Sequence, residues 1–193
     1  MPIYLRLAHE MNGDWYPWSP GAGSNTPAKY VKMWKRVWAI FDRVGVTNVK
    51  WVFSPNVGKP VYAPKYPMRQ FYPGDSYVDL VSLDGYNFAG CNGSPWYSFE
   101  QVFGGSYDEL KAVAPGKPIF VNEVSSDDRC GDKAQWIRDM DGVVPSRFPD
   151  LKAIVWYHLD YGGCHLKADS SQASLDAYKA YLADPYYTAS SLP

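Results

Sequence analysis

Five strand-length apolar runs, separated by turns and helical patterns, constrain the fold of this chain more than any other feature. The runs are Ile3–Ala8, Val49–Phe53, Val78–Leu83, Pro118–Asn122 and Ala153–Tyr157. Each follows a turn or the end of a helical pattern, as strands do. Strands that alternate with helices need crossover connections, so the pattern predicts an α/β fold with a parallel sheet.

The segments between the runs carry helical patterns of unequal strength. The clearest is Thr26–Arg43, an amphipathic pattern with Asn25 or Thr26 as its N-cap. Weaker helical patterns occupy Tyr107–Val113, Lys133–Phe148 and Ser171–Leu182. The connection from Ser54 to Tyr77 is rich in Pro, Gly and Tyr, which predicts a long loop that ends in a short helical turn.

Length and charge restrict the class of protein. The 193 residues fit a single domain over 1–193, and the formal net charge is −1. Lys and Arg are scattered rather than clustered, which argues against nucleic acid or an anionic membrane as partner. We also expect no membrane span, because no apolar run is long enough.

Aromatic residues are unusually frequent: 16 Tyr, 8 Trp and 8 Phe. They either cover contacts between helices and sheet, or line a cleft that stacks on flat apolar ligand faces such as those of sugar rings. Composition leaves both interpretations open.

Cysteine spacing gives no sign of a metal site. Cys91, Cys130 and Cys164 lack C-x-x-C or Cys/His zinc spacing, so we expect no structural metal. One disulfide with a free thiol and three free thiols fit equally well. The segment from Met1 to Leu7 lacks the features of a signal peptide, and we expect none there.

Two glutamates close predicted strands. Strand alternation would place Arg6, Ala8 and Glu10 on one face, and Val121 and Glu123 on one face of the fourth strand. Parallel sheets place function at the carboxyl ends of their strands. Two carboxylates there suit glycosidic cleavage, with one donating a proton and the other attacking the anomeric carbon. Each could instead pair with an arginine or a helix N-terminus.

A zinc site at His9 and Glu10 is excluded by the sequence. The H-E-x-x-H motif needs a second histidine, but Gly13 occupies that position and the segment is predicted as strand rather than helix.

Five segments resemble glycoside hydrolase family 26, in the family's order and over nearly the whole chain. Their most specific motifs are His-Glu-x-x-Gly-x-Trp from His9 and Pro-Gly-Asp-x-Tyr-Val-Asp from Pro73. The segments are Arg6–Trp18, Trp51–Asn56, Tyr72–Asn87, Lys117–Glu123 and Ala153–Tyr157. That family contains endo-β-1,4-mannanases, mixed-linkage β-glucanases and β-1,3-xylanases.

The resemblance implies a (β/α)8 barrel of the TIM type, of which this chain carries strands 4–8. It implies Glu10 as acid/base and Glu123 as nucleophile of a retaining mechanism. The independent strand count agrees, because it places the two glutamates three strands apart. By the same resemblance, substrate would be bound by His9, Trp15, Tyr86 and Trp156, with Tyr86 hydrogen-bonded to the nucleophile. Weaker candidates for the cleft are Trp18, Asn56, Asp84, Asn87 and Trp96, while His158 and His165 are expected to be ordinary loop residues.

The expected activity is therefore endo-hydrolysis of a plant β-glycan, foremost β-1,4-mannan, without metal or organic cofactor and outside the cell. Mixed-linkage β-glucan and β-1,3-xylan are alternative substrates. A non-catalytic glycan-binding protein and an inactive truncated member are the alternatives from other classes. Strands one to three would come from a missing N-terminal half-barrel or from a second chain, because five parallel strands leave two open edges.

Overall fold

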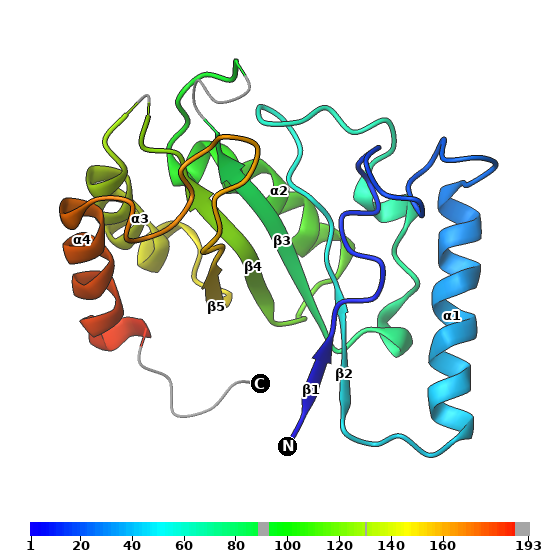
Figure 1. The fold of residues 1–193 in the computed structure, drawn as a ribbon. Helices are drawn as coiled ribbons and strands as arrows, with labels where there is room; N and C mark the ends of the chain where they lie inside the picture. Colours follow the sequence, from blue (N-terminus) through cyan, green and yellow to red (C-terminus); the bar gives the residue numbers. More distant parts are fainter. Residues whose placement is uncertain (89–92, 130, 188–193) are drawn as a thin grey trace.

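The sheet is parallel throughout, as the alternation of strands and helices predicts. A computed structural model describes residues 1–88, 93–129 and 131–187. Its strands lie in chain order, β1-β2-β3-β4-β5, and they curve into half of a barrel with the helices on the outer side (Figure 1). The strands are β1 (Ile3–Leu5), β2 (Val49–Phe53), β3 (Leu80–Asn87), β4 (Ile119–Ser126) and β5 (Leu151–Trp156).

Each α-helix begins at a side chain that accepts a hydrogen bond from the first turn. Thr26 caps the first helix, as predicted, and Ser98 forms a capping box with Gln101 at the second. Asp132 and Ser171 cap the others. The helices are α1 (Pro27–Arg43), α2 (Phe99–Val113), α3 (Lys133–Arg147) and α4 (Gln172–Ala183).

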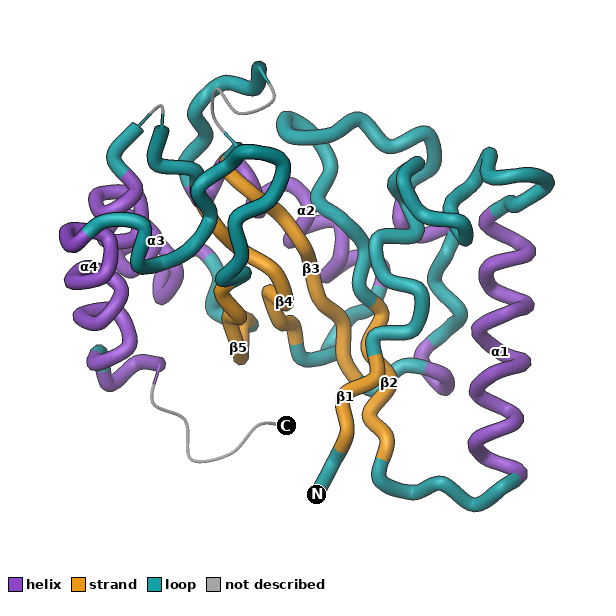
Figure 2. Tube along the Cα trace, viewed as in Figure 1, coloured by secondary structure: helices purple, strands orange, loops and turns teal. Residues whose placement is uncertain are grey.

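Short 3₁₀ helices complete the connections, which Figure 2 shows as mostly irregular chain between strand ends and helices. They are η1 (Met68–Gln70), η2 (Asp75–Tyr77) and η3 (Pro185–Tyr187). The predicted long loop from Ser54 to Tyr77 is confirmed, and it contains the first two of these turns.

β3 and β4 run past the predicted ends Leu83 and Asn122 to Asn87 and Ser126, so Glu123 lies within β4 rather than closing it. Two further boundaries differ from the prediction for a backbone reason. β1 ends at Leu5 rather than Ala8, because Ala8 and Glu10 adopt positive φ values of 46° and 53°, which a strand does not contain. Strand alternation therefore does not explain how Arg6 and Glu10 come together. α2 begins at Phe99, well before the predicted Tyr107, because the capping box at Ser98 starts the helix despite Gly104 and Gly105.

Most aromatic side chains pack between the outer face of the sheet and the helices. Trp34, Phe53, Phe71, Phe99 and Phe103 are fully buried in one continuous core. Burial of a side chain of this size contributes about 1.5–3 kcal/mol to stability. The aromatic content is thus mainly structural, with a smaller set of rings left for the inner side.

The edge strands β1 and β5 have no strand partner on their outer sides within the described ranges. Both expose apolar residues, since Ile3 is 51% and Val155 is 50% exposed. No helix in the described part of the chain is both long and apolar enough to cross a membrane.

Candidate active site

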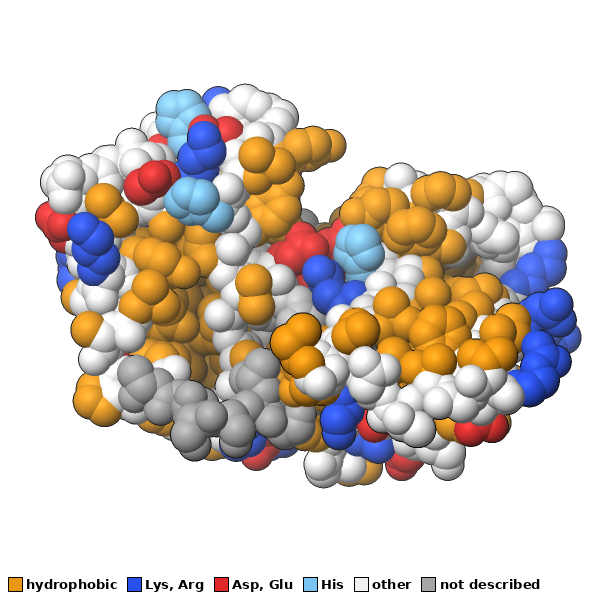
Figure 3. Space-filling model, turned by 60° about the horizontal axis from the view of Figure 1, so that its bottom comes forward, with side chains coloured by type: hydrophobic (Ala, Val, Ile, Leu, Met, Phe, Trp, Pro, Cys, Tyr) orange, Lys and Arg blue, Asp and Glu red, His pale blue; other side chains and the backbone are white. Residues whose placement is uncertain are grey.

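Charged side chains gather toward the carboxyl ends of the strands. Figure 3 shows acidic, basic and histidine side chains at the bottom of a hollow between two apolar rims. Arg6, Asp84 and Glu123 are linked by ion pairs. The register of β3 against β4 sets Asp84 beside Glu123, so the sheet itself fixes the two carboxylates as neighbours.

Arg6 connects the other members of this cluster. Its Nη1 donates to Glu123 Oε1 at 2.8 Å, its Nη2 to Asp84 Oδ2, and its Nε to Ser54 Oγ at 3.2 Å. Hydrogen bonds between ionised groups are roughly twice as strong as neutral ones and are directional. The guanidinium therefore fixes the position of the Glu123 carboxylate relative to the sheet.

Asp84 is fully buried below that contact. Ser54 Oγ donates to Asp84 Oδ2 at 3.1 Å, and Ser82 Oγ in turn donates to Ser54 Oγ at 2.8 Å. Burial, opposed by the Arg6 charge, raises the pKa of Asp84 well above its usual value. Among the described residues, none forms a hydrogen bond with Asp84 Oδ1, so this carboxyl group depends mainly on Arg6 and Ser54 for compensation.

Glu10 lies in a tight turn after β1 rather than on the strand. Its backbone N–H donates to Ser54 O at 2.7 Å, and its carboxylate accepts from Trp15 Nε1 at 2.7 Å. Burial raises the pKa of Glu10 to about 7, and the charge of Glu123 adds to this, while Trp15 and Arg6 oppose it. A carboxyl group that titrates near neutral pH can give and take a proton in one reaction cycle.

Tyr86 holds the other oxygen of Glu123. Its hydroxyl donates to Glu123 Oε2, and burial together with the charge of Glu123 raises the pKa of Tyr86. The Tyr86 hydroxyl therefore keeps its proton and remains a hydrogen-bond donor to Glu123. Phe88 stacks on Tyr86 at a centroid distance of 4.9 Å, and Tyr157 packs edge-on at 5.4 Å. Both oxygens of Glu123 are therefore fixed, one by a cation and one by a neutral donor.

His9 belongs to an aromatic group beside Glu10. Its Nε2 lies 3.0 Å from Tyr16 Oη, and Trp18 Nε1 donates to His9 O at 2.8 Å. Tyr16 and Trp18 stack at 4.4 Å. Burial, followed by the positive charge of Arg6, lowers the pKa of His9, so the ring is neutral at neutral pH.

The two tryptophans that were predicted to bind substrate have different positions. Trp15 is 45% exposed and lies against Glu10. Trp156 is only 9% exposed and packs in the core against Trp136 and Tyr178, with its Nε1 donating to Leu166 O at 3.0 Å. The structure therefore does not bring Trp156 to the cluster.

Tyr157, the residue after Trp156, contacts the cluster instead, through Tyr86. Successive residues of a strand point to opposite faces, so the residue that follows the outward-facing Trp156 points inward. Tyr157 contacts Tyr86, and burial together with the charge of Glu123 raises its pKa. The sequence carries no signal for this, because the residue types do not show which face of β5 packs on the helices.

The remaining predicted cleft residues are mainly structural. Asn56 is buried and hydrogen-bonded to Asn12, and Asn87 is buried and donates to Ser126 Oγ. Trp96 packs against the core. His158 accepts a hydrogen bond from Ala168 N in the loop after β5, and His165 lies 3.3 Å from Asp128.

The described residues contain no group of three His, Cys, Asp or Glu side chains arranged for a metal ion. Cys164 is disulfide-bonded, whereas Cys91 and Cys130 lie outside the described residues.

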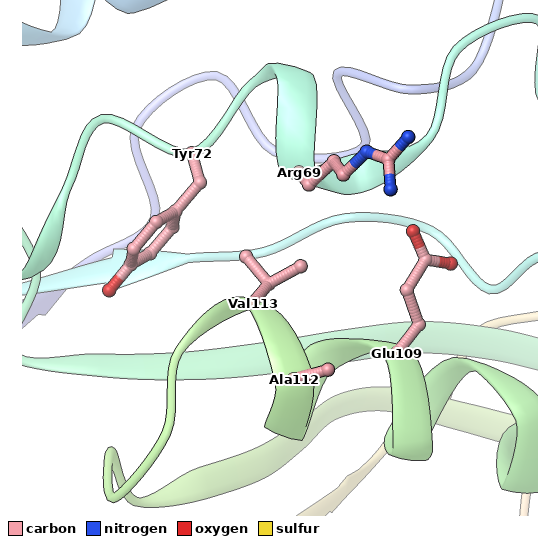
Figure 4. A pocket seen from close by; sticks show the side chains of 5 residues that line it. All are labelled: Arg69, Tyr72, Glu109, Ala112 and Val113. Atoms are coloured by element: carbon pink, nitrogen blue, oxygen red, sulfur yellow. The ribbon is translucent and has the colours of Figure 1, made fainter.

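A separate pocket of about 490 Å³ lies between η1 and α2, and neither Glu10 nor Glu123 lines it (Figure 4). Arg69 and Glu109 lie at one end of it and Tyr72 at the other (Figure 4). Glu109 Oε1 accepts from Met68 N at 3.1 Å, so it connects α2 to η1. This contact gives Glu109 a structural role.

Comparisons with known proteins point to one family of glycoside hydrolases. The profile of glycosyl hydrolase family 26 matches residues 1–136. Endoglucanase H of Acetivibrio thermocellus is 39% identical over 181 residues, which are 92% of this chain and 20% of that protein. A mannan endo-1,4-β-mannosidase of Bacillus subtilis is 28% identical over 130 residues, 64% of this chain and 30% of that protein.

Solved structures show the same fold. The catalytic domain of an endo-β-1,4-mannanase from Bacillus sp. JAMB-750 matches with a TM-score of 0.73 and 22% identity, over 98% of this chain and 51% of that one. An endo-β-1,4-mannanase of Cellulomonas fimi, a double mutant, gives a TM-score of 0.71 and 24% identity, over 96% of this chain and 41% of that one. The chain thus spans about half or less of each of these proteins.

Proposed function

Because the chain belongs to glycosyl hydrolase family 26, we propose that it carries the catalytic centre of a retaining endo-β-glycanase. Glu10 is its acid/base and Glu123 its nucleophile. One observation carries the proposal: the two carboxylates lie in opposite environments. Glu10 is buried with a pKa of about 7, whereas Glu123 is bound by a guanidinium cation. Such a contrast is what separates an acid from a nucleophile.

In the first displacement, a carboxylate oxygen of Glu123 attacks the anomeric carbon. The bond from that carbon to the leaving oxygen breaks, and the leaving oxygen takes the proton of Glu10. In the second, water attacks the same carbon, Glu10 takes the proton of the water, and the bond to Glu123 breaks. The two inversions return the original configuration and protonation states. Retaining pairs of this kind stand about 5–5.5 Å apart.

The surrounding residues have separate roles in this cycle. Arg6 and Tyr86 orient the Glu123 carboxylate and stabilise the charge that returns to it when the glycosyl bond breaks. Trp15 orients the acid/base. Trp15, beside Glu10, and Tyr157, beside Tyr86, offer aromatic rings for the C–H faces of the sugars. No cofactor is needed for these steps.

A non-catalytic glycan-binding protein is less consistent with the cluster. Burying Asp84 and Arg6 and raising the pKa of Glu10 all cost folding free energy. Binding by stacking on aromatic rings requires none of these, whereas catalysis requires a fixed nucleophile and a protonated acid.

Mannan is the proposed substrate, in an extracellular setting where intact polysaccharides are found. The names of several relatives and structural neighbours support mannan. The 39% identical relative is named an endoglucanase, and this supports β-glucan as the second candidate. The chemistry at Glu10 and Glu123 is the same for both.

The test is release of reducing ends from mannan, lichenan and β-1,3-xylan in parallel, with wild type and Glu123→Ala. We expect hydrolysis of one of them by the wild type and none by the variant, with oligosaccharide binding retained. Glu100→Ala is the matched control, because Glu100 lies on the surface of α2. A Glu123→Ala variant as active as the parent would contradict the assignment.

We further propose that additional βα units cover the free edges of the sheet, either from the same polypeptide or from a second chain. The exposed Ile3 and Val155 on these edges, and the larger size of the matching catalytic domains, support this. Light scattering combined with the hydrolysis assay tests it. Full activity from a lone monomer of this chain would contradict it.

A further inference from the structure

We propose that Gly13 is a positioning residue for the acid/base: its lack of a side chain lets the Trp15 indole lie against the backbone and hold the Glu10 carboxylate. The inference rests on the proposed role of Glu10. It adds a residue that makes no contact with substrate and acts through Trp15.

The space above Gly13 is filled by the indole. A Cβ on Gly13 would lie 2.5 Å from Trp15 Cζ2, 2.6 Å from Cη2 and 2.7 Å from Cε2. Carbon atoms that are not bonded approach to about 3.5–4.0 Å. Cε2 is bonded to Nε1, the atom that donates to Glu10 Oε2 at 2.7 Å. A side chain at Gly13 would therefore displace the part of the indole that makes this hydrogen bond.

The backbone around Gly13 is fixed, so it cannot move to relieve such a contact. Gly13 N donates to Glu10 O at 3.0 Å. Met11 is fully buried. Asn12 Nδ2 donates to Asn56 O at 2.7 Å, while its Oδ1 accepts from Asn56 N at 2.8 Å. The turn is thus bound to the loop after β2, and the indole must be the part that shifts.

The indole is held from a second loop as well. Tyr62 packs against Trp15 at 5.1 Å in a T-shaped contact, and the Tyr62 hydroxyl donates to the carboxylate of Asp14. Within the described residues, Trp15 Nε1 is the one hydrogen-bond donor to the Glu10 carboxylate. Gly13, Trp15 and Tyr62 together therefore set the orientation of the acid/base.

Loss of this hydrogen bond has a chemical signature. A donor to the carboxylate favours its ionised form, so its removal moves the pKa of Glu10 further upward. Misorientation weakens proton donation to the leaving oxygen. A leaving group that needs no proton, such as 2,4-dinitrophenolate, escapes this loss in the first displacement.

The experiment compares Gly13→Ala with wild type on two substrates: the polysaccharide that the wild type cleaves, and a 2,4-dinitrophenyl glycoside of the corresponding oligosaccharide. We expect kcat/KM to fall about 10- to 100-fold on the polysaccharide, since general acid catalysis contributes about 10²–10⁴-fold. On the activated glycoside we expect less than about a threefold loss. The basic limb of the pH profile on the polysaccharide should move upward.

Two further variants complete the design. Trp15→Phe keeps a ring but removes the donor, and should reproduce the selective loss. Gly142→Ala is the matched control, because a Cβ there meets nothing within 4 Å, and it should leave both rates unchanged. Equal losses on both substrates, or an unchanged Gly13→Ala enzyme, would overturn the proposal.

Carboxyl ¹³C NMR titration of Glu10 separates this inference from the proposed function. An upward pKa change in Gly13→Ala supports the positioning role even if no glycan is hydrolysed, and an unchanged pKa overturns it. Failure of the wild type on every substrate counts against the proposed function instead.

Discussion

Replacing Glu10 by glutamine should stabilise the protein at neutral and alkaline pH while abolishing its activity on polysaccharide. Glu10 is only 7% exposed, and burial is the main cause of its raised pKa. Glutamine keeps an oxygen that accepts from Trp15 Nε1 but carries no charge. The substitution therefore removes the cost of a buried carboxylate and preserves its hydrogen bond.

The magnitude follows from the pKa of Glu10. An increase from 4.5 to about 7, at about 1.4 kcal/mol per unit, corresponds to about 3 kcal/mol. Below pH 4.5 the carboxyl is protonated in both folded and unfolded chains, so wild type and variant should be equally stable. As pH rises toward 7, the unfolded chain loses its proton first, and the wild type loses stability relative to Glu10→Gln.

Urea denaturation of both proteins at pH 4, 5.5 and 8 measures this difference. We expect the gap in unfolding free energy to grow from near zero at pH 4 to about 3 kcal/mol at pH 8. Glu100→Gln, on the surface of α2, should show no such growth. A gap that is absent, or that is independent of pH, would refute the assignment of a buried, proton-binding Glu10.

Three other substitutions test the cluster and its support. Arg6→Met should lower the unfolding free energy by about 3–5 kcal/mol, because it leaves the buried Asp84 unpaired. In urea denaturation, the double variant with Asp84→Asn should recover part of this loss. No recovery would mean that the Arg6–Asp84 pair is not the cause. Tyr86→Phe should lower kcat about 10- to 100-fold, the value of one hydrogen bond to a charged group. A folded variant with full kcat would exclude this role. Lys133→Met should lower the unfolding free energy by about 1–3 kcal/mol. The reason is that Lys133 Nζ donates to His165 O, Lys167 O and Ser170 Oγ in the loop after β5. Unchanged thermal stability of the variant would contradict this.

The sequence was sufficient for the fold class and family, and for the strand that carries Glu123. Periodic apolar runs and turn residues are local signals, and the parallel five-stranded sheet confirms them. The motif from His9 to Trp15 pointed to the family that the profile match shows. These features depend on residues close together in the chain.

What the sequence did not reveal depends on backbone conformation and long-range pairing. β1 ends early because Ala8 and Glu10 have positive φ values. Neither alanine nor glutamate is a residue type that predicts a positive φ. Arg6 connects the cluster through contacts with Asp84 and Glu123, which lie far from it in the sequence. Whether Trp156 or Tyr157 faces the cluster depends on which face of β5 packs on the helices. The residue types alone do not determine this.

Covalent trapping tests the central claim most directly. The protein would be incubated with a 2-deoxy-2-fluoro glycosyl fluoride of the cleaved glycan, which slows release of a glycosyl-enzyme, and then analysed by peptide mass spectrometry. We predict one glycosyl group per chain, attached to the peptide that contains Glu123. A label on another residue, or none from an enzyme that inverts its product, would contradict the account.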